Sequence, residues 1–350
     1  MAKRAKRKKV LKAVDFFCCA GGVTSGFIKA GIRVLGGIDI EGAYKETYEK
    51  NNKGVKFIQA DISKLSPRGL HKRLGIKKNM DDLIFVGCSP CQYYSNMHTD
   101  KTKSEEGRLL LEDFKRFVEY YNPGYIFIEN VPGLDTKEGS PLANFKDFIA
   151  GMGYVFDEKV VNAANYNVPQ NRNRYILLAT RVGKNIKVPA GNLNRVKTVR
   201  QAIGSLKPIP AGYKDAAPLK HWTANLEYIN RLRIQHTSKN GGTRLEWKDD
   251  PELQLPCYVG KDDTFPDVYG RMFWDKPSPT ITTKFHSITN GRFGHPEQDR
   301  ALSIREGALL QSFHKKYRFY SNRIAVMAKM IGNAVPPELA KSVGRTFLKI

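Results

Sequence analysis

Between residues 14 and 180 the chain alternates short β-branched or aromatic runs with stretches of helical periodicity, and this alternation strongly constrains the fold. Parallel βαβ units produce such a pattern, because each strand of a parallel sheet is followed by a crossover helix. We therefore predict an α/β fold with a doubly wound, Rossmann-like sheet. The predicted strands are 14–17, 34–38, 55–59, 83–86, 125–128 and 175–179, and the predicted helices are 24–30, 109–121 and 142–152.

The pattern changes after residue 181, which indicates a second domain. Residues 184–279 are rich in Pro, Gly, Asn and Lys and show weak periodicity. Ser303 and Glu306 form a capping-box pattern before residues 308–313, and a last helix starts at Pro336. We predict a flexible basic arm over residues 1–12, a sheet domain over 13–182, and a smaller irregular domain with a hinge over 183–325. A C-terminal segment over 326–350 is expected to return to the sheet domain.

The charge balance points to a polyanionic partner. The chain has 58 Lys and Arg against 34 Asp and Glu, a net charge of +24, and seven of the first twelve residues are basic. Such an excess favours nucleic acid, or less strongly an anionic membrane surface; a merely soluble basic protein is the alternative. No stretch reaches the roughly 20 apolar residues of a membrane span, and the start lacks the apolar core of a signal peptide. We expect a cytoplasmic, nucleoid-associated protein with no membrane partner, whose five cysteines are reduced thiols.

A glycine-containing loop separates the first predicted strand from the first predicted helix. Residues 15–22 are Asp-Phe-Phe-Cys-Cys-Ala-Gly-Gly. In open α/β sheets, ligands bind beyond the carboxyl ends of the strands, and glycines there let the backbone approach them. Asp39 ends the second strand, where it can accept hydrogen bonds from ribose, and Asp61 ends the third, where it can accept an adenine amino group. The G-x-G-x-x-G spacing is absent, so we predict an adenosine site without pyrophosphate; ordinary tight turns are the alternative.

Cys91 follows a buried strand and a proline, in the segment Cys88-Ser-Pro-Cys91-Gln92. The Cys88-x-x-Cys91 spacing is half of a zinc site, but no second pair follows and the histidines lack ligand spacing, so we predict no metal. A thiol held at the mouth of a nucleotide-binding sheet is better interpreted as a nucleophile, with a buried structural cysteine as the alternative.

Glu129 and two arginines complete the candidate chemistry. Glu129 follows three apolar residues at the end of the fifth strand, where a carboxylate is costly to bury unless it is protonated or paired. Arg172 and Arg174 stand at alternate positions, so we expect their side chains on one side of the sheet. They can bind phosphate or a base carbonyl; a surface salt-bridge stripe is the alternative.

These motifs, in this order, resemble those of the cytosine-5 DNA methyltransferases of bacterial and phage restriction-modification systems. The resemblance covers nearly the whole chain except residues 184–265. The matching segments are 15–22, Pro90-Cys91-Gln92, Glu129-Asn130-Val131, Gln170 with Arg172 and Arg174, 277–283, 295–298, 302–306 with 310–313, and 331–336. Two departures are Cys19, where glycine is usual, and Cys88-Ser89, where Gly-Pro is common.

The resemblance implies S-adenosylmethionine as cofactor. The residues that it implies for the cofactor site are Phe17, Gly21, Gly22, Asp39, Ile40, Asp61, Ile62, Pro90, Asn333 and Val335. This agrees with an adenosine site that lacks pyrophosphate. Cys19 would add bulk beside the methionine part of the cofactor.

The resemblance also implies a mechanism on duplex DNA. Cys91 would attack carbon 6 of a flipped-out cytosine, Glu129 would hold or protonate ring nitrogen 3, Arg174 would bind the exocyclic oxygen, and Arg172 would support the pocket. Gln92, Ser95 and Asn130 would contact DNA, and the polar segment after Cys91 would close as a lid. Residues 184–270 would be the target-recognition region, in which basic side chains contact phosphates and a few polar ones contact base edges in the major groove.

Three other classes remain as alternatives. A transfer-RNA cytosine-5 methyltransferase would keep the same motifs, but the sizeable basic insertion favours DNA. A DNA-binding pseudoenzyme would have lost Cys91, Glu129 or Arg174, and an oxidoreductase leaves Pro90-Cys91-Gln92 unexplained. We expect a monomer, with any cognate restriction endonuclease acting as a separate protein.

Overall fold

The structure is a computed structural model that describes residues 10–89, 102–136, 140–194, 196–215 and 220–350. The chain forms two compact units. Unit 1 comprises Met1–Val161, Asn173–Ala190 and Leu339–Ile350, and unit 2 comprises Asn162–Arg172 and Gly191–Glu338. The predicted domain limits remain predictions; contacts within the chain place the corresponding divisions after Ala190 and before Leu339.

Unit 1 is built on a seven-stranded sheet with the order β3-β2-β1-β4-β5-β7-β6. The strands are β1 (Lys12–Phe16), β2 (Arg33–Asp39), β3 (Lys56–Gln59), β4 (Leu83–Gly87), β5 (Tyr125–Asn130), β6 (Val155–Asn162) and β7 (Asn173–Thr180). The first five strands pair in parallel, which confirms the Rossmann-like prediction. β7 is antiparallel to β5, so the expectation of parallel units up to residue 180 was wrong at the last strand.

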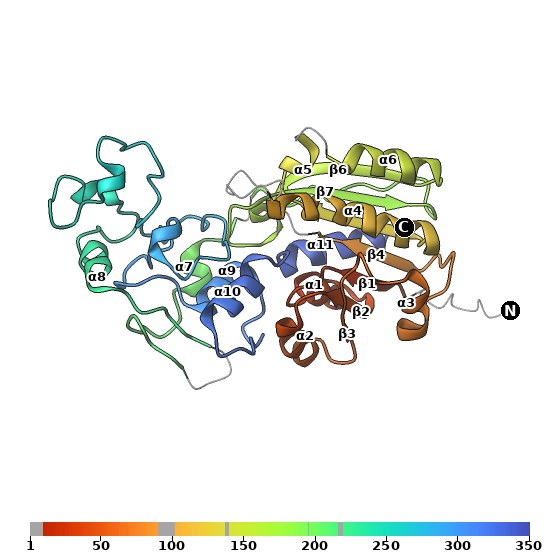
Figure 1. The fold of residues 1–350 in the computed structure, drawn as a ribbon, viewed down its shortest axis with the longest axis horizontal. Helices are drawn as coiled ribbons and strands as arrows, with labels where there is room; N and C mark the ends of the chain where they lie inside the picture. Colours follow the sequence, from red (N-terminus) through yellow and green to blue (C-terminus); the bar gives the residue numbers. More distant parts are fainter. Residues whose placement is uncertain (1–9, 90–101, 137–139, 195, 216–219) are drawn as a thin grey trace. The chain divides into compact units, whose positions relative to one another are not determined.

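Helices cover both faces of this sheet (Figure 1). Phe16 of β1 packs against Phe114 and Phe117 on one face, with ring centroids 5.2 and 5.1 Å away. On the other face, Phe27 stacks on Phe127 of β5. Alternate residues of a strand point to opposite faces, so two apolar faces require two helical layers. The helices are α1 (Gly22–Ala30), α2 (Lys45–Asn51), α3 (Pro67–Leu74), α4 (Thr102–Tyr121), α5 (Gly133–Thr136), α6 (Leu142–Gly151) and α11 (Pro337–Phe347), with a 3₁₀ turn at Gly42–Tyr44. A second 3₁₀ turn, Ala163–Tyr166, belongs to unit 2.

The sequence pattern missed β6, the strand at the edge of the sheet. Its residues Val-Phe-Asp-Glu-Lys-Val-Val-Asn are mostly exposed or half-buried. An edge strand has one neighbour and can carry charges that protect it from further pairing, so it lacks the apolar run of a central strand. Among the described residues, no helix combines the length and the apolar character that crossing a lipid bilayer requires.

Unit 2 has little regular structure. Its helices are α7 (Val199–Ile203), α8 (Tyr228–Gln235), α9 (Ile304–Leu310) and α10 (Ile324–Gly332), with 3₁₀ turns at Arg244–Trp247, Pro256–Tyr258 and Ile288–Asn290. From residue 191 to 338 the described residues form no strand, only isolated bridges such as Arg271–Gly294. The predicted capping box is confirmed, because Ser303 and Glu306 cap α9 reciprocally.

Buried arginine side chains satisfy much of this irregular backbone. Arg233, Arg244, Arg271 and Arg300 are buried, and each donates to backbone carbonyls. A guanidinium carries five N–H donors, so it can satisfy carbonyls that a sheet ladder would otherwise pair. Arg300 also forms a bidentate ion pair with Glu306 at 2.8 and 2.7 Å, and both side chains are 1% exposed.

Four separate segments of unit 2 are joined by one buried polar network. Gln170 donates to Gln311 Oε1 at 2.8 Å and accepts from Ile281 N, while Gln311 donates to the carbonyls of Ile331 and Ala334. A Cβ on Gly332 would collide with the backbone of Thr282, so glycine permits this close packing. These segments are among those that carried the resemblance, and here they stabilise one another.

Candidate active site

The candidate site lies at the carboxyl ends of the parallel strands of unit 1. The chain runs from β1 outward to β2 and β3, and then from β4 outward to β5, so the strand order reverses between β1 and β4. Ligands of open α/β sheets bind at such a switch point. The predicted residues that follow these strands are Phe17, Gly21 and Gly22 after β1, Asp39 and Ile40 at the end of β2, and Glu129 and Asn130 at the end of β5. Pro90, Cys91, Gln92 and Ser95 lie outside the described residues.

Glu129 and Arg174 form a buried ion pair. Arg174 Nε lies 3.0 Å from Glu129 Oε1, and the two side chains are 10% and 9% exposed. The contact is not aligned as a hydrogen bond, so Oε1 has no hydrogen-bond partner among the described residues. Arg174 also donates through Nη1 to the carbonyl of Asn173. The pairing explains how a carboxylate tolerates this apolar strand.

Asn130 connects the end of β5 to the segment that leads to Cys91. Its side-chain nitrogen lies 3.3 Å from both the carbonyl oxygen and Oγ of Ser89, and its side-chain oxygen accepts from Val131 N. Asn130 is buried. The structure thus gives it a positioning contact, and its predicted contact with DNA remains a prediction.

The loop after β1 is strained. Phe17 and Cys19 have φ angles of 61° and 47°, and Gly21 has φ 87° at the N-cap of α1. Non-glycine residues rarely adopt this left-handed region, and strain of this kind concentrates at functional sites. Cys19 stands where glycine is usual in the family that the sequence resembles. Because a cysteine has a Cβ, its positive φ angle strains the backbone at this position, which a glycine would not do.

Asp39 fixes the same loop from β2. Its Oδ2 accepts from Cys19 N at 2.8 Å and its Oδ1 accepts from Glu41 N at 2.9 Å. Burial raises the pKa of Asp39, although these bonds oppose the shift. The next residue, Ile40, is 65% exposed, which leaves an apolar side chain beside the carboxylate without a cover among the described residues.

Asp61 lies beyond β3 in a more exposed position. Its Oδ1 accepts from Ser63 N at 3.0 Å and Oγ at 2.7 Å. These hydrogen bonds lower the pKa of Asp61, so its carboxylate is charged. Ile62, the next residue, is buried.

The sequence analysis missed a buried polar chain behind the loop. Asp15 Oδ2 accepts from Thr24 Oγ1 at 2.7 Å, and Thr24 Oγ1 lies 2.8 Å from the Tyr48 hydroxyl. A Cβ on Gly37 would collide with this hydroxyl and with Cys18 Sγ. Asp15 Oδ1 is buried without a hydrogen-bond partner among the described residues, and burial raises the pKa of Asp15 to about 7.

Replacing Asp15 with asparagine should flatten part of the pH dependence of stability. The folded-state pKa of Asp15 is raised from 3.8 to about 7. The contribution of its protonated carboxyl to the free energy of unfolding is therefore fully present below pH 3.8 and is lost as the pH rises towards 7. The asparagine side chain does not titrate, so stability of the wild type relative to the variant should fall by up to about 1.4 kcal/mol per pH unit across that window. Denaturant unfolding at several pH values measures this difference; parallel curves for the two proteins would contradict it.

Three described cysteines at the site are neutral thiols. Burial raises the pKa of Cys18 and Cys19 well above the ordinary value. Burial, followed by the charge of Glu129, does the same for Cys88. The nucleophilic form of cysteine is the thiolate, so these three side chains are poor candidates for the nucleophile.

The other predicted site residues lie in unit 2. Arg172 directly precedes β7 and Arg174 is the second residue of that strand. The expected placement of both guanidiniums on one side of the sheet stays a prediction. Arg172 donates to the carbonyls of Ile281 and Gly332, both at 3.0 Å. Asn333 caps the C-terminal end of α10, and Val335 is buried. Their predicted cofactor contacts remain predictions.

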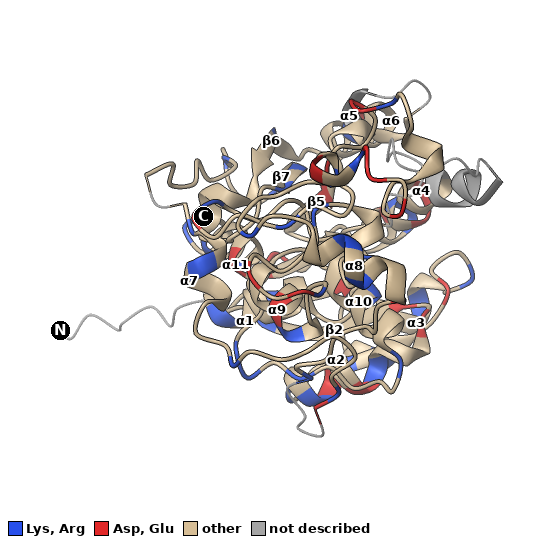
Figure 2. Ribbon diagram, turned by 90° about the vertical axis from the view of Figure 1, so that its left-hand side faces the viewer, with Lys and Arg blue, Asp and Glu red and all other residues tan. Residues whose placement is uncertain are grey.

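The basic residues of unit 2 divide into exposed and buried groups. Figure 2 shows Lys and Arg positions in blue on α7 and α8. Arg231 of α8 is exposed, whereas Arg233 and Arg244 are buried and donate to carbonyls of their own unit. These two guanidiniums are therefore bonded within their own unit, and which of the exposed basic side chains of 184–270 contact DNA stays a prediction.

The fold and the site define a class of protein, the Rossmann-like α/β proteins with a candidate ligand site at the carboxyl ends of the parallel strands. Among solved structures, a prophage-encoded DNA modification methyltransferase candidate from Escherichia coli has the same fold, with a TM-score of 0.74 and 19% identity over 97% of this chain and 99% of that one. A DNMT2 variant from Spodoptera frugiperda has a TM-score of 0.64 and 14% identity over 95% of this chain and 98% of that one.

Sequence comparison gives the family. The family model described as C-5 cytosine-specific DNA methylase matches residues 11–349. Type II methylase M.HgiDII of Herpetosiphon aurantiacus is 39% identical over 95% of this chain and 94% of its own length. Type II methyltransferase M1.HphI of Haemophilus parahaemolyticus is 33% identical over 97% and 87%. The chain belongs to the C-5 cytosine-specific DNA methylase family and is a DNA cytosine-5 methyltransferase of the restriction-modification type.

Proposed function

We propose that this enzyme methylates carbon 5 of a cytosine that is flipped out of a specific duplex DNA sequence. Cys91 would be the nucleophile at carbon 6, and S-adenosylmethionine the methyl donor. The observation that carries the proposal is the buried Glu129–Arg174 pair, which joins the carboxyl end of β5 to the start of β7 and keeps Glu129 Oε1 without a hydrogen-bond partner among the described residues. Asn130 holds the adjacent Ser89, so the same strand end also anchors the approach to Cys91.

The residues of unit 1 fit S-adenosylmethionine. A strained loop with Gly21 at a helix N-terminus, a half-buried carboxylate at Asp39 and an exposed apolar side chain at Ile40 suit a ligand with an amino-acid part, a ribose and an adenine. When bound, the cofactor supplies the methyl group. Phe17, Gly21, Gly22, Asp39, Ile40, Asp61, Ile62 and Pro90 would hold it, with Asn333 and Val335 contributed from the distant C-terminal motif.

The protein side chains would act on the pyrimidine ring. Addition of the Cys91 thiolate to carbon 6 breaks the aromaticity and makes carbon 5 an enamine carbon. Glu129 would hold or protonate nitrogen 3, and Arg174 would bind the exocyclic oxygen as negative charge develops. Once carbon 5 carries the methyl group, loss of its proton to a base would re-form the carbon 5–carbon 6 double bond, and the carbon 6–sulfur bond would break with its electrons going to the Cys91 thiolate.

The burial of this pair implies base flipping. Arg174 and Glu129 are about one-tenth exposed, and a base stacked inside a duplex cannot reach them. Extrusion costs a few kcal/mol, which contacts with the extruded base and the DNA backbone would offset. Unit 2 would supply the sequence recognition.

The direct test is methyl transfer from labelled S-adenosylmethionine to duplex DNA and, separately, to transfer RNA. We expect label in the duplex only, mapped as 5-methylcytosine by bisulfite sequencing. Label in transfer RNA only would contradict the proposal.

Replacing Glu129 with glutamine should lower kcat about 100-fold or more, because the amide cannot supply the proton while charge develops on the ring. Its KM for S-adenosylmethionine should not change. Glu46→Gln, which removes an exposed carboxylate paired with Lys50 on α2, is the matched control. Equal turnover numbers for the two variants would remove Glu129 from the mechanism.

A further inference from the structure

One loop of unit 2 presents apolar side chains to solvent. Residues 259–267, called here the 259–267 loop, follow the 3₁₀ turn Pro256–Tyr258 and precede Val268 and Tyr269 of the unit 2 core. Val259 and Phe265 are 61% and 67% exposed. An exposed phenylalanine gains no hydrophobic stabilisation within its own chain, so its presence here needs another reason.

Phe265 also has a strained backbone. Its φ angle is 48°, in the left-handed region that costs a residue with a Cβ about 1–2 kcal/mol. Its side chain is 67% exposed, so burial offsets little of that cost. Backbone strain at a residue with an exposed side chain is typical of a residue that contacts a ligand.

Two guanidiniums hold the loop in this conformation. Arg244 is buried, its Nη2 donates to the carbonyls of Lys261, Asp262 and Thr264 at 3.1, 3.1 and 2.8 Å, and the guanidinium lies 4.3 Å from the ring centroid of Tyr258. At the other end, Arg292 Nε donates to Asp267 Oδ1 at 2.7 Å. The loop is anchored at both ends, as a recognition element on a rigid support should be.

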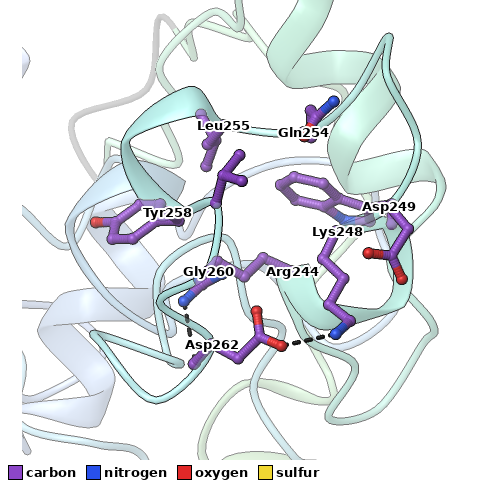
Figure 3. Close-up of a pocket in the computed structure, with 10 residues that line it drawn as sticks. Arg244, Lys248, Asp249, Gln254, Leu255, Tyr258, Gly260 and Asp262 are labelled. Carbon is purple, nitrogen blue, oxygen red and sulfur yellow. Dashed lines mark hydrogen bonds and ion pairs between the residues drawn. The ribbon is translucent and has the colours of Figure 1, made fainter.

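A pocket lies beside the first half of the loop. Figure 3 shows Arg244, Lys248 and Asp262 side by side in its wall. Lys248 Nζ bonds to Asp262 Oδ2 at 2.6 Å, so both charges are paired. The residues that line the pocket keep the loop in place and leave its outer side chains available.

The charges of the loop balance. Asp262 and Asp267 are neutralised by Lys248 and Arg292, and the exposed Lys261 and Asp263 have no ion-pair partner among the described residues. The loop therefore has no net positive charge to attract phosphate. In the major groove, however, a carboxylate such as that of Asp263 accepts a hydrogen bond from the cytosine amino group, and phenylalanine contacts the thymine methyl group.

We propose that the 259–267 loop determines sequence specificity by contacting base edges in the major groove of duplex DNA. Asp263 accepts a hydrogen bond from a cytosine amino group, and Phe265 contacts a thymine methyl group. The inference rests on the proposed function, since it assigns the recognition step of that same methylation.

The test compares methylation of a duplex library with randomised bases around the target cytosine. Asp263→Asn and Phe265→Gly should each lose roughly tenfold or more in preference, in kcat/KM, at one base pair, a cytosine position for the first and a thymine position for the second. Leu193→Ala, which removes another exposed apolar side chain of unit 2, should keep the wild-type preference.

Two further measurements separate recognition from structure. Glycine adopts φ 48° without strain, so Phe265→Gly should melt no lower than the wild type while its preference relaxes. Wild-type preference in both loop variants would overturn the inference, and so would a change in oligomeric state of Phe265→Gly with unchanged preference. Absence of DNA methylation by the wild type would instead contradict the proposed function.

Discussion

Replacing Cys91 with serine is expected to abolish methyl transfer to duplex DNA, with a loss of at least about a thousandfold in kcat. A serine hydroxyl is a far weaker nucleophile than a thiolate near neutral pH, so carbon 5 would not be activated. The affinity for duplex DNA should be retained, because serine replaces the sulfur atom by oxygen and changes the volume of the side chain little. Steady-state transfer of labelled methyl groups and fluorescence anisotropy with a target duplex measure the two properties.

A duplex with 5-fluorocytosine at the target position provides a second readout. Fluorine cannot leave carbon 5 as a proton does, so the wild type should form a complex that survives denaturation. The serine variant should form none. Cys257→Ser, which changes an exposed thiol of unit 2, should behave like the wild type. A stable adduct that maps to a residue other than Cys91 would show that the nucleophile is misassigned.

Replacing Glu306 with glutamine is expected to reduce the free energy of unfolding by about 3–5 kcal/mol, because it leaves the buried Arg300 guanidinium without its counter-charge. Glu306 also accepts from Ser303 N at 2.7 Å, so the capping box of α9 is weakened by the same change. Denaturant unfolding measures the loss. The double variant Arg300→Met, Glu306→Leu removes both charges, and it should recover much of the stability; a double variant as unstable as Glu306→Gln would show that the lost packing, not the unpaired charge, dominates.

The pH dependence of this effect has a definite sign. Burial opposes the shift, but the hydrogen bonds and charge of Arg300 lower the pKa of Glu306 from 4.5 to about 2. Because the pKa of Glu306 is lower in the folded state, its ionised carboxylate contributes fully to the free energy of unfolding above pH 4.5. That contribution is lost as the pH falls towards 2. The difference in the free energy of unfolding between the wild type and Glu306→Gln should therefore decrease by about 3 kcal/mol as the pH falls across that window. A gap that is constant from about pH 5 to about pH 2 would contradict the assignment.

The sequence predicted the central sheet well because buried parallel strands are continuous apolar runs. β4 and β5 follow that pattern, and both were placed within two residues of their ends. β6 carries charges on an edge, and the direction of β7 depends on tertiary contacts that periodicity does not contain. The structure of unit 2 could not be predicted from local sequence patterns, because long-range side-chain hydrogen bonds, such as that from Gln170 to Gln311, hold its segments together.

At the site, the sequence indicated which residue types stand at the strand ends but not which of them bond to each other. Glu129 was expected to be paired or protonated, and the structure identifies Arg174 as its partner. The chain from Asp15 through Thr24 to Tyr48 joins residues up to 33 positions apart, and no local pattern marks it. The positive φ of Cys19 was equally hidden, although the glycine that is usual there in related sequences was a sign of it.

The buried guanidiniums of unit 2 bear on how DNA binding should respond to ionic strength. Each phosphate that a protein neutralises releases counterions, and log Kobs then falls against log salt concentration with a slope of about −0.9 per contact. Arg233, Arg244, Arg271 and Arg300 count towards the net charge of +24, yet they are bonded to carbonyls inside the protein. A salt titration should therefore report fewer phosphate contacts than the excess of basic residues in the sequence suggests.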